Sequence, residues 1–264
     1  MPGSGENSGI GMLPTNPSQI NTPEGPGSSP RGVISVILAT YQEGENIRDM
    51  IAAIFAVLAD PVEIIVVDDD SPDLTWKIAS GLNDPRVKVI RRIKTRGLAS
   101  AINRGIIESR GDYIGWMDAD MCHPPTLLPR MLTALHGCDV VIGSRYVKGG
   151  NDDRAPSRVL TSRFINRLAS LVLGHGILDY DSGFILMHRR VLDSVSLSPT
   201  GYGAYFIEFI FACSRKGLKV DEIPYTFTER VKGVSKSNTN LFQFGMAGLG
   251  YILRILKTRF SHLD

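Results

Sequence analysis

The stretch YIGWMDAD at residues 113–120 joins an apolar run to two acids that stand one residue apart. Tyr113–Met117 is short, apolar and partly aromatic, which predicts a buried β-strand. Asp118 and Asp120 follow at the point where that strand ends. Carboxylate oxygens suit Mg²⁺ and Mn²⁺, and one or two carboxylates together with substrate phosphates form a typical site. The stretch therefore predicts a strand that carries a metal-binding acid pair to one edge of a sheet.

The same pair has a simpler explanation in local helix geometry. A helix is expected to begin near Pro124, and aspartate is favoured just before a helix whose first turn contains proline. Asp118 and Asp120 would then only cap that helix. The pair alone does not decide between the two interpretations, so the rest of the chain has to.

Strands and helices alternate on both sides of this stretch, which predicts an α/β fold with a mostly parallel sheet covered by helices. The expected strands are Val33–Ala39, Glu63–Asp68, Val87–Ile90, Tyr113–Met117 and Val140–Gly143. The expected helices between them are Asn46–Ala59, Leu74–Leu82, Leu98–Ser109 and Thr126–His136. After Gly150 we expect, in order, a helix, a strand, a helix and a short strand pair, at Ser157–Leu173, Ser182–Met187, Tyr205–Ser214 and Val220–Thr228.

Polar clusters follow two further strands of the predicted sheet. Residues 39–43 (ATYQE) come after the first strand and residues 68–71 (DDDS) after the second. Because ligands of open α/β sheets bind at the carboxyl ends of the strands, one cleft is expected to collect both clusters and the acid pair. Asp69 is the candidate for a contact with a nucleotide, whereas Asp70 and Asp73 are expected to form a capping turn.

Composition limits the class of protein. The 264 residues are 43% hydrophobic, which is enough for one sizeable domain. The formal net charge of +2 is far below that of a dedicated nucleic-acid binder, so no nucleic-acid partner is expected. Three cysteines without CxxC spacing indicate neither a disulfide framework nor a zinc site, and they fit a reducing cytosol.

The two ends of the chain differ from its middle. Residues 1–32 are rich in Gly, Pro and Ser and lack a basic stretch followed by an apolar core, so we expect a disordered tail and no secretory signal. The apolar segment Leu241–Leu256 is interrupted by three glycines, Gln243 and Arg254, which argues against a membrane span. The expected organisation is a tail over 1–32, a catalytic domain over 33–238, and an amphipathic, membrane-interfacial helix over 239–264.

Seven motifs in order give the chain a family resemblance: ATYQEGENI (39–47), VVDDDSPD (66–73), RGLASAINRGI (96–106), MDADMCHPP (117–125), GSRYVKGG (143–150), DSGF (181–184) and ERVKGVSK (229–236). Over about residues 33–242 their order and spacing resemble family 2 glycosyltransferases, in particular the dolichyl-phosphate mannose synthases and related polyprenyl-phosphate glycosyltransferases. The resemblance implies a GT-A fold, Mg²⁺ or Mn²⁺, and inverting transfer of mannose from GDP-mannose to a polyprenyl (dolichyl-type) phosphate.

The resemblance also assigns roles to residues. The nucleotide-sugar-binding positions that it implies are Ala39, Tyr41, Glu43, Val67, Asp69, Asp118, Ala119, Asp120, Arg145, Arg230 and Lys236. The acceptor phosphate positions are Arg145, Arg158 and Arg163, and the catalytic positions are Asp118, Asp120, Arg145 and Glu208. The metal positions are Asp118, Asp120 and Cys122, where some relatives carry glutamine; a thiol is a poor Mg²⁺ ligand, so Cys122 is the weakest of the three.

A polyprenyl acceptor requires contact with a membrane. Two features fit a peripheral position on the cytoplasmic face, with a membrane protein as a further expected partner. One is an apolar stripe made of Phe164, Ile165, Leu168, Leu171 and Val172, and the other is the pair Lys257 and Arg259 after Leu241–Leu256. Packing of the stripe into the core is the alternative.

Other functions stay open at this point. A glycosyltransferase of the same fold could use another sugar nucleotide, of the UDP-glucose type, or a glycan hydroxyl acceptor. An inactive nucleotide-sugar-binding protein would keep the fold without turnover. A nucleotidyltransferase also combines a nucleotide with metal ions, but no glycine-rich basic loop follows the first strand.

Overall fold

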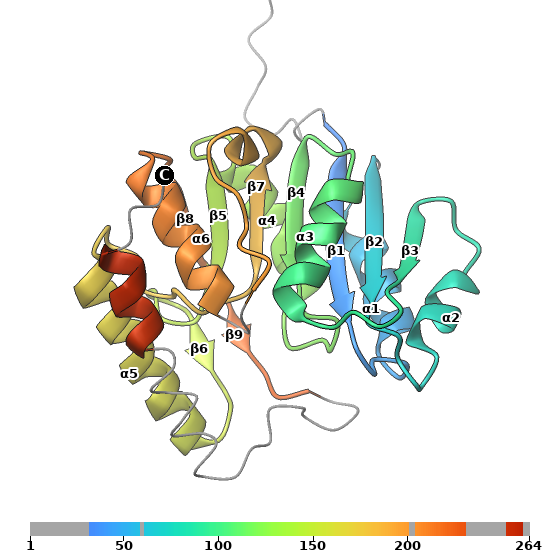
Figure 1. Cartoon of the computed structure of the whole chain (residues 1–264), viewed down its shortest axis with the longest axis horizontal. Helices are drawn as coiled ribbons and strands as arrows, with labels where there is room; N and C mark the ends of the chain where they lie inside the picture. Colours follow the sequence, from blue (N-terminus) through green and yellow to red (C-terminus); the bar gives the residue numbers. More distant parts are fainter. Residues whose placement is uncertain (1–31, 59–60, 201–203, 231–251, 261–264) are drawn as a thin grey trace, which may run out of the picture.

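The computed structural model describes residues 32–58, 61–200, 204–230 and 252–260. Residues 1–31 of the predicted tail fall outside these ranges, as do Lys236 and the boundary between residues 238 and 239. A central sheet with helices on both of its faces dominates the described part (Figure 1).

Seven strands form this sheet in the order β3-β2-β1-β4-β7-β5-β8. Their bounds are β1 Ile34–Thr40, β2 Val62–Asp68, β3 Val87–Arg91, β4 Tyr113–Met117, β5 Val140–Ser144, β7 Ile185–His188 and β8 Val220–Pro224. Only β7 runs antiparallel to its neighbours, β4 and β5. The predicted mostly parallel sheet is confirmed. Each of the five strands predicted before Gly150 begins and ends within one residue of the observed strand.

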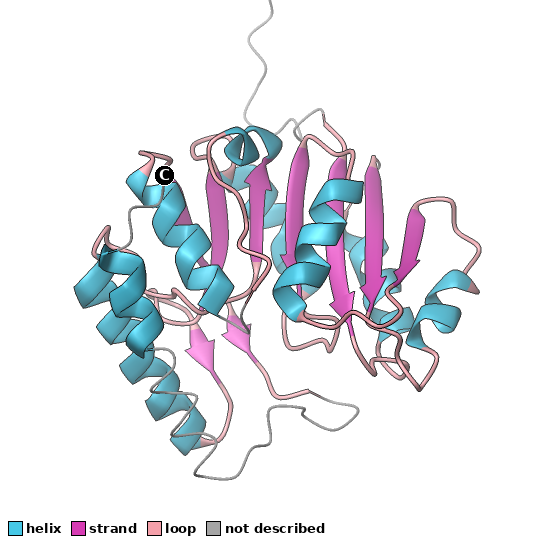
Figure 2. Cartoon of the chain, in the orientation of Figure 1, coloured by secondary structure: helices cyan, strands magenta, loops and turns pink. Residues whose placement is uncertain are grey.

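Helices cover both faces because the strands are apolar on both (Figure 2). Their bounds are α1 Ile47–Val57, α2 Thr75–Ser80, α3 Leu98–Glu108, α4 Leu128–Ala134, α5 Pro156–Leu173 and α6 Ala204–Arg215, with short 3₁₀ turns η1 Pro125–Leu127 and η2 Arg189–Asp193. Alternate residues of β1 enter different cores: Ile37 packs with α3 and α6, and Leu38 packs with α1 and α4. A further helix within residues 252–260, here named the C-terminal helix, places Ile255 in the same core as Ile37.

Helix α3 lies unusually close to the sheet, as its small residues indicate. A Cβ atom added to Gly105 would overlap the side chain of Ile37 on β1. The helix therefore depends on glycine at this position in order to rest on the strand.

Two strands lie within Val220–Thr228 as predicted, but the prediction that they pair with each other was wrong. Strand β8 pairs with β5, whereas β9 (Thr226–Phe227) pairs with β6 (Asn151–Asp152) in a separate two-stranded sheet. Only Tyr225 separates β8 from β9, and one residue is too short to reverse the chain as a hairpin loop does. The two strands instead continue in one direction and leave the main sheet near the end of β5.

Candidate functional site

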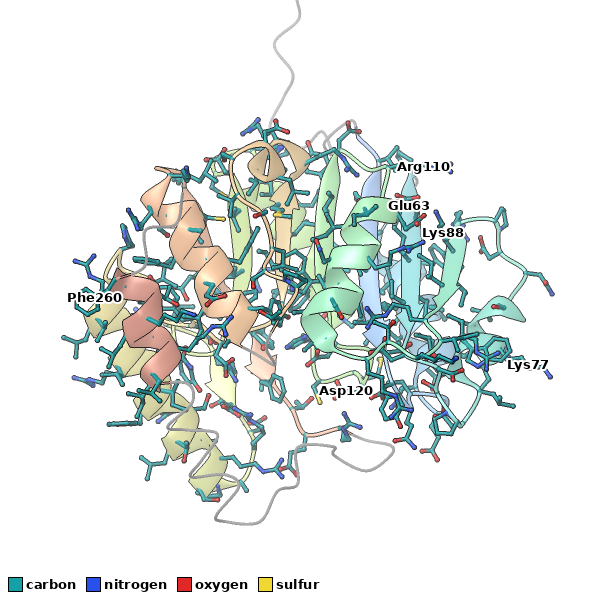
Figure 3. All side chains as sticks on the ribbon, viewed as in Figure 1. Glu63, Lys77, Lys88, Arg110, Asp120 and Phe260 are labelled. Atoms are coloured by element: carbon teal, nitrogen blue, oxygen red, sulfur yellow. The ribbon has the colours of Figure 1, made fainter. Side chains whose placement is uncertain are left out.

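The polar clusters predicted after β1, β2 and β4 lie at one edge of the sheet, because these three strands are parallel neighbours. Figure 3 shows Asp120 at the opposite end of the sheet from Glu63 and Arg110. Glu63 belongs to the first half of β2, so Asp120 lies at the carboxyl edge. This is the edge at which open α/β sheets bind ligands.

A buried carboxylate joins the loops after β1 and β2. Asp68 accepts hydrogen bonds from the Thr40 hydroxyl at 2.7 Å and from the Ser71 hydroxyl at 2.6 Å. Ser71 in turn accepts the backbone N–H of Gln42 at 2.9 Å. Sequence reasoning did not select Asp68 as a site residue. Its position as the last residue of a buried strand could have indicated this role, because a buried carboxylate needs hydrogen-bond donors.

Asp69, the expected nucleotide contact, is already bound within the protein. Its carboxylate accepts Nε of Arg92 at 2.6 Å and the backbone N–H of Gly97 at 2.8 Å, just before α3 begins. Asp69 is 6% exposed, so little of it faces solvent. Its contacts fix the start of α3 beside β2.

Other predicted nucleotide positions differ in how much side chain they expose. Val67 is wholly buried and Ala119 is 3% exposed, so neither residue presents a free surface to a ligand. Ala39 is partly buried against the core on the α3 side. Tyr41 is half-buried, with the guanidinium of Arg96 at 4.5 Å from its ring centroid.

The capping explanation of the acid pair is contradicted. The turn η1 begins after Pro124, and no side chain caps its first N–H groups. Asp120 instead uses one oxygen to accept the backbone N–H of Cys122 at 3.1 Å and the other to accept Nη2 of Arg230 at 2.6 Å.

Arg230 connects the loop after β4 to the loop after β1. Its Nη2 also lies 3.7 Å from Oε1 of Glu43, which is 7% exposed. Glu43 is held by the side chain of Asn46 at 3.0 Å and by its own N–H, which donates to Thr75 at 2.9 Å. Three sequence segments that are far apart therefore meet at one charged cluster, as predicted for Glu43, Asp120 and Arg230.

The charges of this cluster suit a divalent cation. Burial, together with the neighbouring carboxylates of Asp120 and Glu43, raises the pKa of Asp118 to about 7. Negative charge therefore exceeds what Arg230 balances. Among the described residues no group of three His, Cys, Asp or Glu side chains could hold a metal ion, so Asp118 and Asp120 would have to share a cation with substrate phosphates.

Cys122 does not fit as the third metal ligand. It is 4% exposed, and burial followed by the charge of Asp120 raises the pKa of its thiol far above the ordinary value. Metal ligation requires the thiolate, which this environment disfavours. The expectation for Cys122 is corrected accordingly.

Arg145, an expected phosphate-binding residue, is buried in an ion pair. Its Nε and Nη2 donate to the two oxygens of Asp179 at 2.9 and 2.7 Å, and Nη2 also donates to the carbonyl of Asp181 at 3.0 Å. The side chains of Arg145 and Asp179 are 3% and 0% exposed. Only Nη1 makes no hydrogen bond to a described residue, so any phosphate would meet that atom alone.

The expected acceptor residues lie on α5, next to the loop that carries Arg145. The Tyr146 hydroxyl donates to Ser162 of α5 at 2.8 Å. Arg158 is half-buried and Arg163 is exposed on the same helix. Asp179 and Ser162 were both missed because neither stands in a segment whose sequence pattern indicates a contact.

Glu208, one of the expected catalytic residues, forms an ion pair within the protein. It lies on α6 and pairs with Arg254 of the C-terminal helix, whose Nη2 donates to it at 2.8 Å. The observed contact anchors that helix to the body. Its contacts lend no support to a role in proton transfer.

Comparisons with known proteins cover most of the chain. Residues 35–196 match the family model for glycosyl transferase family 2. A dolichol-phosphate mannosyltransferase from Pyrococcus furiosus is 40% identical over 232 residues, which are 85% of this chain and 64% of that protein. A polyprenol monophosphomannose synthase from Mycolicibacterium smegmatis is 36% identical over 237 residues, 85% of this chain and 89% of that protein.

The fold also has solved counterparts. Glucosyl-3-phosphoglycerate synthase from Mycobacterium tuberculosis, crystallised with Mn²⁺, UDP and glucosyl-3-phosphoglycerate, superposes with a TM-score of 0.66 at 22% identity, over 89% of this chain and 82% of that chain. At this identity the match concerns the fold, which is the predicted GT-A fold. The chain spans about two thirds of the length of the Pyrococcus relative and most of the length of the Mycolicibacterium relative. The matched family model and both curated relatives show that the chain belongs to glycosyl transferase family 2.

Proposed function

We propose that this protein transfers mannose from GDP-mannose, with inversion, to a polyprenyl phosphate of the dolichyl type. The observation that carries the proposal is the cluster in which Arg230 bridges Asp120 and Glu43 beside Asp118 at the carboxyl edge of the sheet. Two curated relatives named for dolichol and polyprenol mannose synthesis support the choice of sugar and acceptor.

In this proposal Asp118 and Asp120 would hold Mg²⁺ or Mn²⁺, which would supply positive charge to balance a diphosphate leaving group. Arg230 adds a guanidinium, suited to phosphate oxygens, and orients Asp120. Lys236, outside the described residues, is proposed to add a second cation. Catalysis then depends on alignment and charge stabilisation.

A phosphate acceptor also removes the need for a strong base. The second pKa of a phosphate monoester is about 6, so the attacking oxygen is already largely anionic at neutral pH. A sugar hydroxyl would instead need a base. The engagement of Glu208 by Arg254 therefore favours the phosphate acceptor.

We further propose that α5 and the C-terminal helix lie on the cytoplasmic face of a membrane. The predicted stripe divides: Ile165 and Val172 pack against the core, whereas Phe164 and Leu171 are 60% and 77% exposed. Phe260, which points away from the body in Figure 3, is 78% exposed.

The charge of α5 and the C-terminal helix also supports membrane contact at this surface. The two helices carry six Arg and Lys residues and no acid over their described residues: Arg158, Arg163, Arg167, Arg254, Lys257 and Arg259. Basic residues beside an apolar stripe are attracted to anionic lipids. No helix within the described ranges has the length and apolar character to cross a membrane. A membrane-protein partner stays a prediction.

A second candidate is transfer of another sugar from a UDP donor, since the solved structures of similar fold hold UDP. Purified protein with Mg²⁺ or Mn²⁺ would be given labelled GDP-mannose or UDP-glucose, each with polyprenyl phosphate or free sugars. We expect product only from GDP-mannose and polyprenyl phosphate. Turnover of free sugars alone would exclude the proposed acceptor, and donor binding without turnover of any pair would indicate an inactive binding protein.

Membrane contact has its own measurement. Co-sedimentation with anionic vesicles should decrease in the Phe164→Gln and Phe260→Gln variants. The matched control is Ile107→Gln, because Ile107 is also exposed (70%) but lies on α3. Equal sedimentation of all three variants would rule out this surface.

A further inference from the structure

His123 lies three residues beyond Asp120 and is almost wholly buried, with 1% of its surface exposed. Its ring stacks on Phe184 at a centroid distance of 5.1 Å and an interplanar angle of 17°. Tyr225 and Phe227 approach it edge-on at 5.8 and 5.5 Å. Three aromatic rings thus fix the plane of the imidazole.

The chain turns back sharply to bring this ring beside the acid pair. Met121 has a φ of 67°, in the left-handed region that residues with a side chain seldom adopt. The turn places Nδ1 of His123 at 3.1 Å from the backbone nitrogen of Asp118, and that N–H donates to Nδ1. Asp118 is the first residue after β4, so this hydrogen bond fixes the backbone where the strand ends.

The ring can accept this hydrogen bond only while Nδ1 carries no proton. A neutral ring then carries its proton on Nε2. Nε2 is buried beside the backbone of Ser182 but makes no hydrogen bond of normal geometry to a described residue. A buried N–H without a good partner costs stability, so filling of the core alone does not explain histidine here, whereas its acceptor nitrogen does.

We propose that His123 is a positioning residue for the acid pair: by accepting the Asp118 N–H, it sets the direction in which the two carboxylates leave β4. The idea rests on the proposed function, since it assumes that Asp118 and Asp120 share a divalent cation. Asp120 is held separately, by the N–H of Cys122 and by Arg230. The backbone of Asp118 and the carboxylate of Asp120 are thus positioned before any ligand binds, which saves the free energy of ordering them later.

Two substitutions separate the acceptor from the packing. His123→Phe keeps a flat ring against Phe184 but has no acceptor for the Asp118 N–H. His123→Asn loses ring volume but carries an oxygen where Nδ1 stood. His188→Phe is the matched control, because His188 is a half-buried histidine that meets Tyr113 at the other end of β4.

The measurement is the dissociation constant of Mn²⁺ in the presence of GDP, from the electron paramagnetic resonance signal of free Mn²⁺, together with the melting temperature of each variant. We expect His123→Phe to weaken Mn²⁺ binding about tenfold, which corresponds to about 1.4 kcal/mol and lies near the upper end of what one lost hydrogen bond costs. His123→Asn should melt at a lower temperature yet bind Mn²⁺ within about threefold of wild type. His188→Phe should change at most the melting temperature.

Wild-type affinity in His123→Phe, or Mn²⁺ affinity that follows the melting temperature across the variants, would refute the positioning role while leaving the proposed function intact. Wild-type protein that binds no Mn²⁺ with GDP or UDP would refute both. Should His123→Asn fail to fold, the comparison of His123→Phe with His188→Phe still decides the question.

Discussion

The buried ion pair of Arg145 and Asp179 allows a sharp test of what Arg145 does. Asp179→Asn keeps the shape of the side chain but removes its charge, so the guanidinium of Arg145 stays buried without a counter-charge. Breaking a buried pair by removing one partner costs about 3–5 kcal/mol. The observed burial, with side chains 3% and 0% exposed, places this pair in that class. At about 2–4 °C per kcal/mol for a domain of this size, the melting temperature should fall by about 6–20 °C.

The assay is urea and thermal unfolding of the wild type and three variants. Asp70→Asn is the control, because Asp70 forms an exposed ion pair with Arg91. The side chains of Asp70 and Arg91 are 35% and 41% exposed. Exposed pairs contribute about 0–1 kcal/mol, so this control should melt within a few degrees of wild type. Asp179→Leu combined with Arg145→Met should recover most of the lost stability, because well-packed apolar groups replace buried pairs at little cost.

Activity of the double variant then separates the two roles of Arg145. Full recovery of stability with lost turnover would assign Nη1 of Arg145 to a substrate phosphate, whereas recovery of both would make the residue structural. The reasoning is refuted if Asp179→Asn is no more destabilising than Asp70→Asn.

Three further predictions concern other parts of the molecule. Asp118→Asn and Asp120→Asn should each lower kcat at saturating donor by at least about a hundredfold, since each removes a charge that is proposed to hold the cation. Turnover within tenfold of wild type in steady-state assays would contradict this. If the main role of Glu208 is its ion pair with Arg254, Glu208→Gln and Arg254→Gln should each lower the free energy of unfolding by about 1–3 kcal/mol in urea titrations. A loss of kcat in Glu208→Gln alone would instead support a catalytic role for Glu208. Gly105→Ala should cost about 1–3 kcal/mol through overlap with β1, and an unchanged urea midpoint would show that α3 can move away.

Most of the fold could be predicted because apolar periodicity is a local signal. Strands buried on both faces appear as short apolar runs, which is why Tyr113–Met117 was placed at its observed bounds. The pairing of β8 and β9 could not be predicted in this way. It depends on which distant strand each one meets, and sequence spacing alone carries no information about β5 or β6.

In the candidate site, too, residues that belong to a local sequence pattern could be predicted, whereas contacts between distant residues could not. Asp118 and Asp120 were accessible to sequence reasoning because two acids after a buried strand form a compact local pattern. The partner of Arg145 was not, because Asp179 lies 34 residues away in the chain. Sequence reasoning could therefore propose Arg145 as a phosphate-binding residue. It could not show that the charge of Arg145 is already balanced inside the protein.

The balance of charge decides between the two first explanations of the acid pair. Glu43, Asp120 and Asp181 all act on Asp118 as negative charges, and Arg230 is the cation that opposes them. A carboxylate that served only as a helix cap would be stabilised by N–H groups and would carry no such repulsion. Buried charge without compensation is costly, so a fold keeps it where a ligand of opposite sign binds. The proposed divalent cation, shared with a diphosphate, would provide that charge, and an uncharged or purely anionic ligand would not.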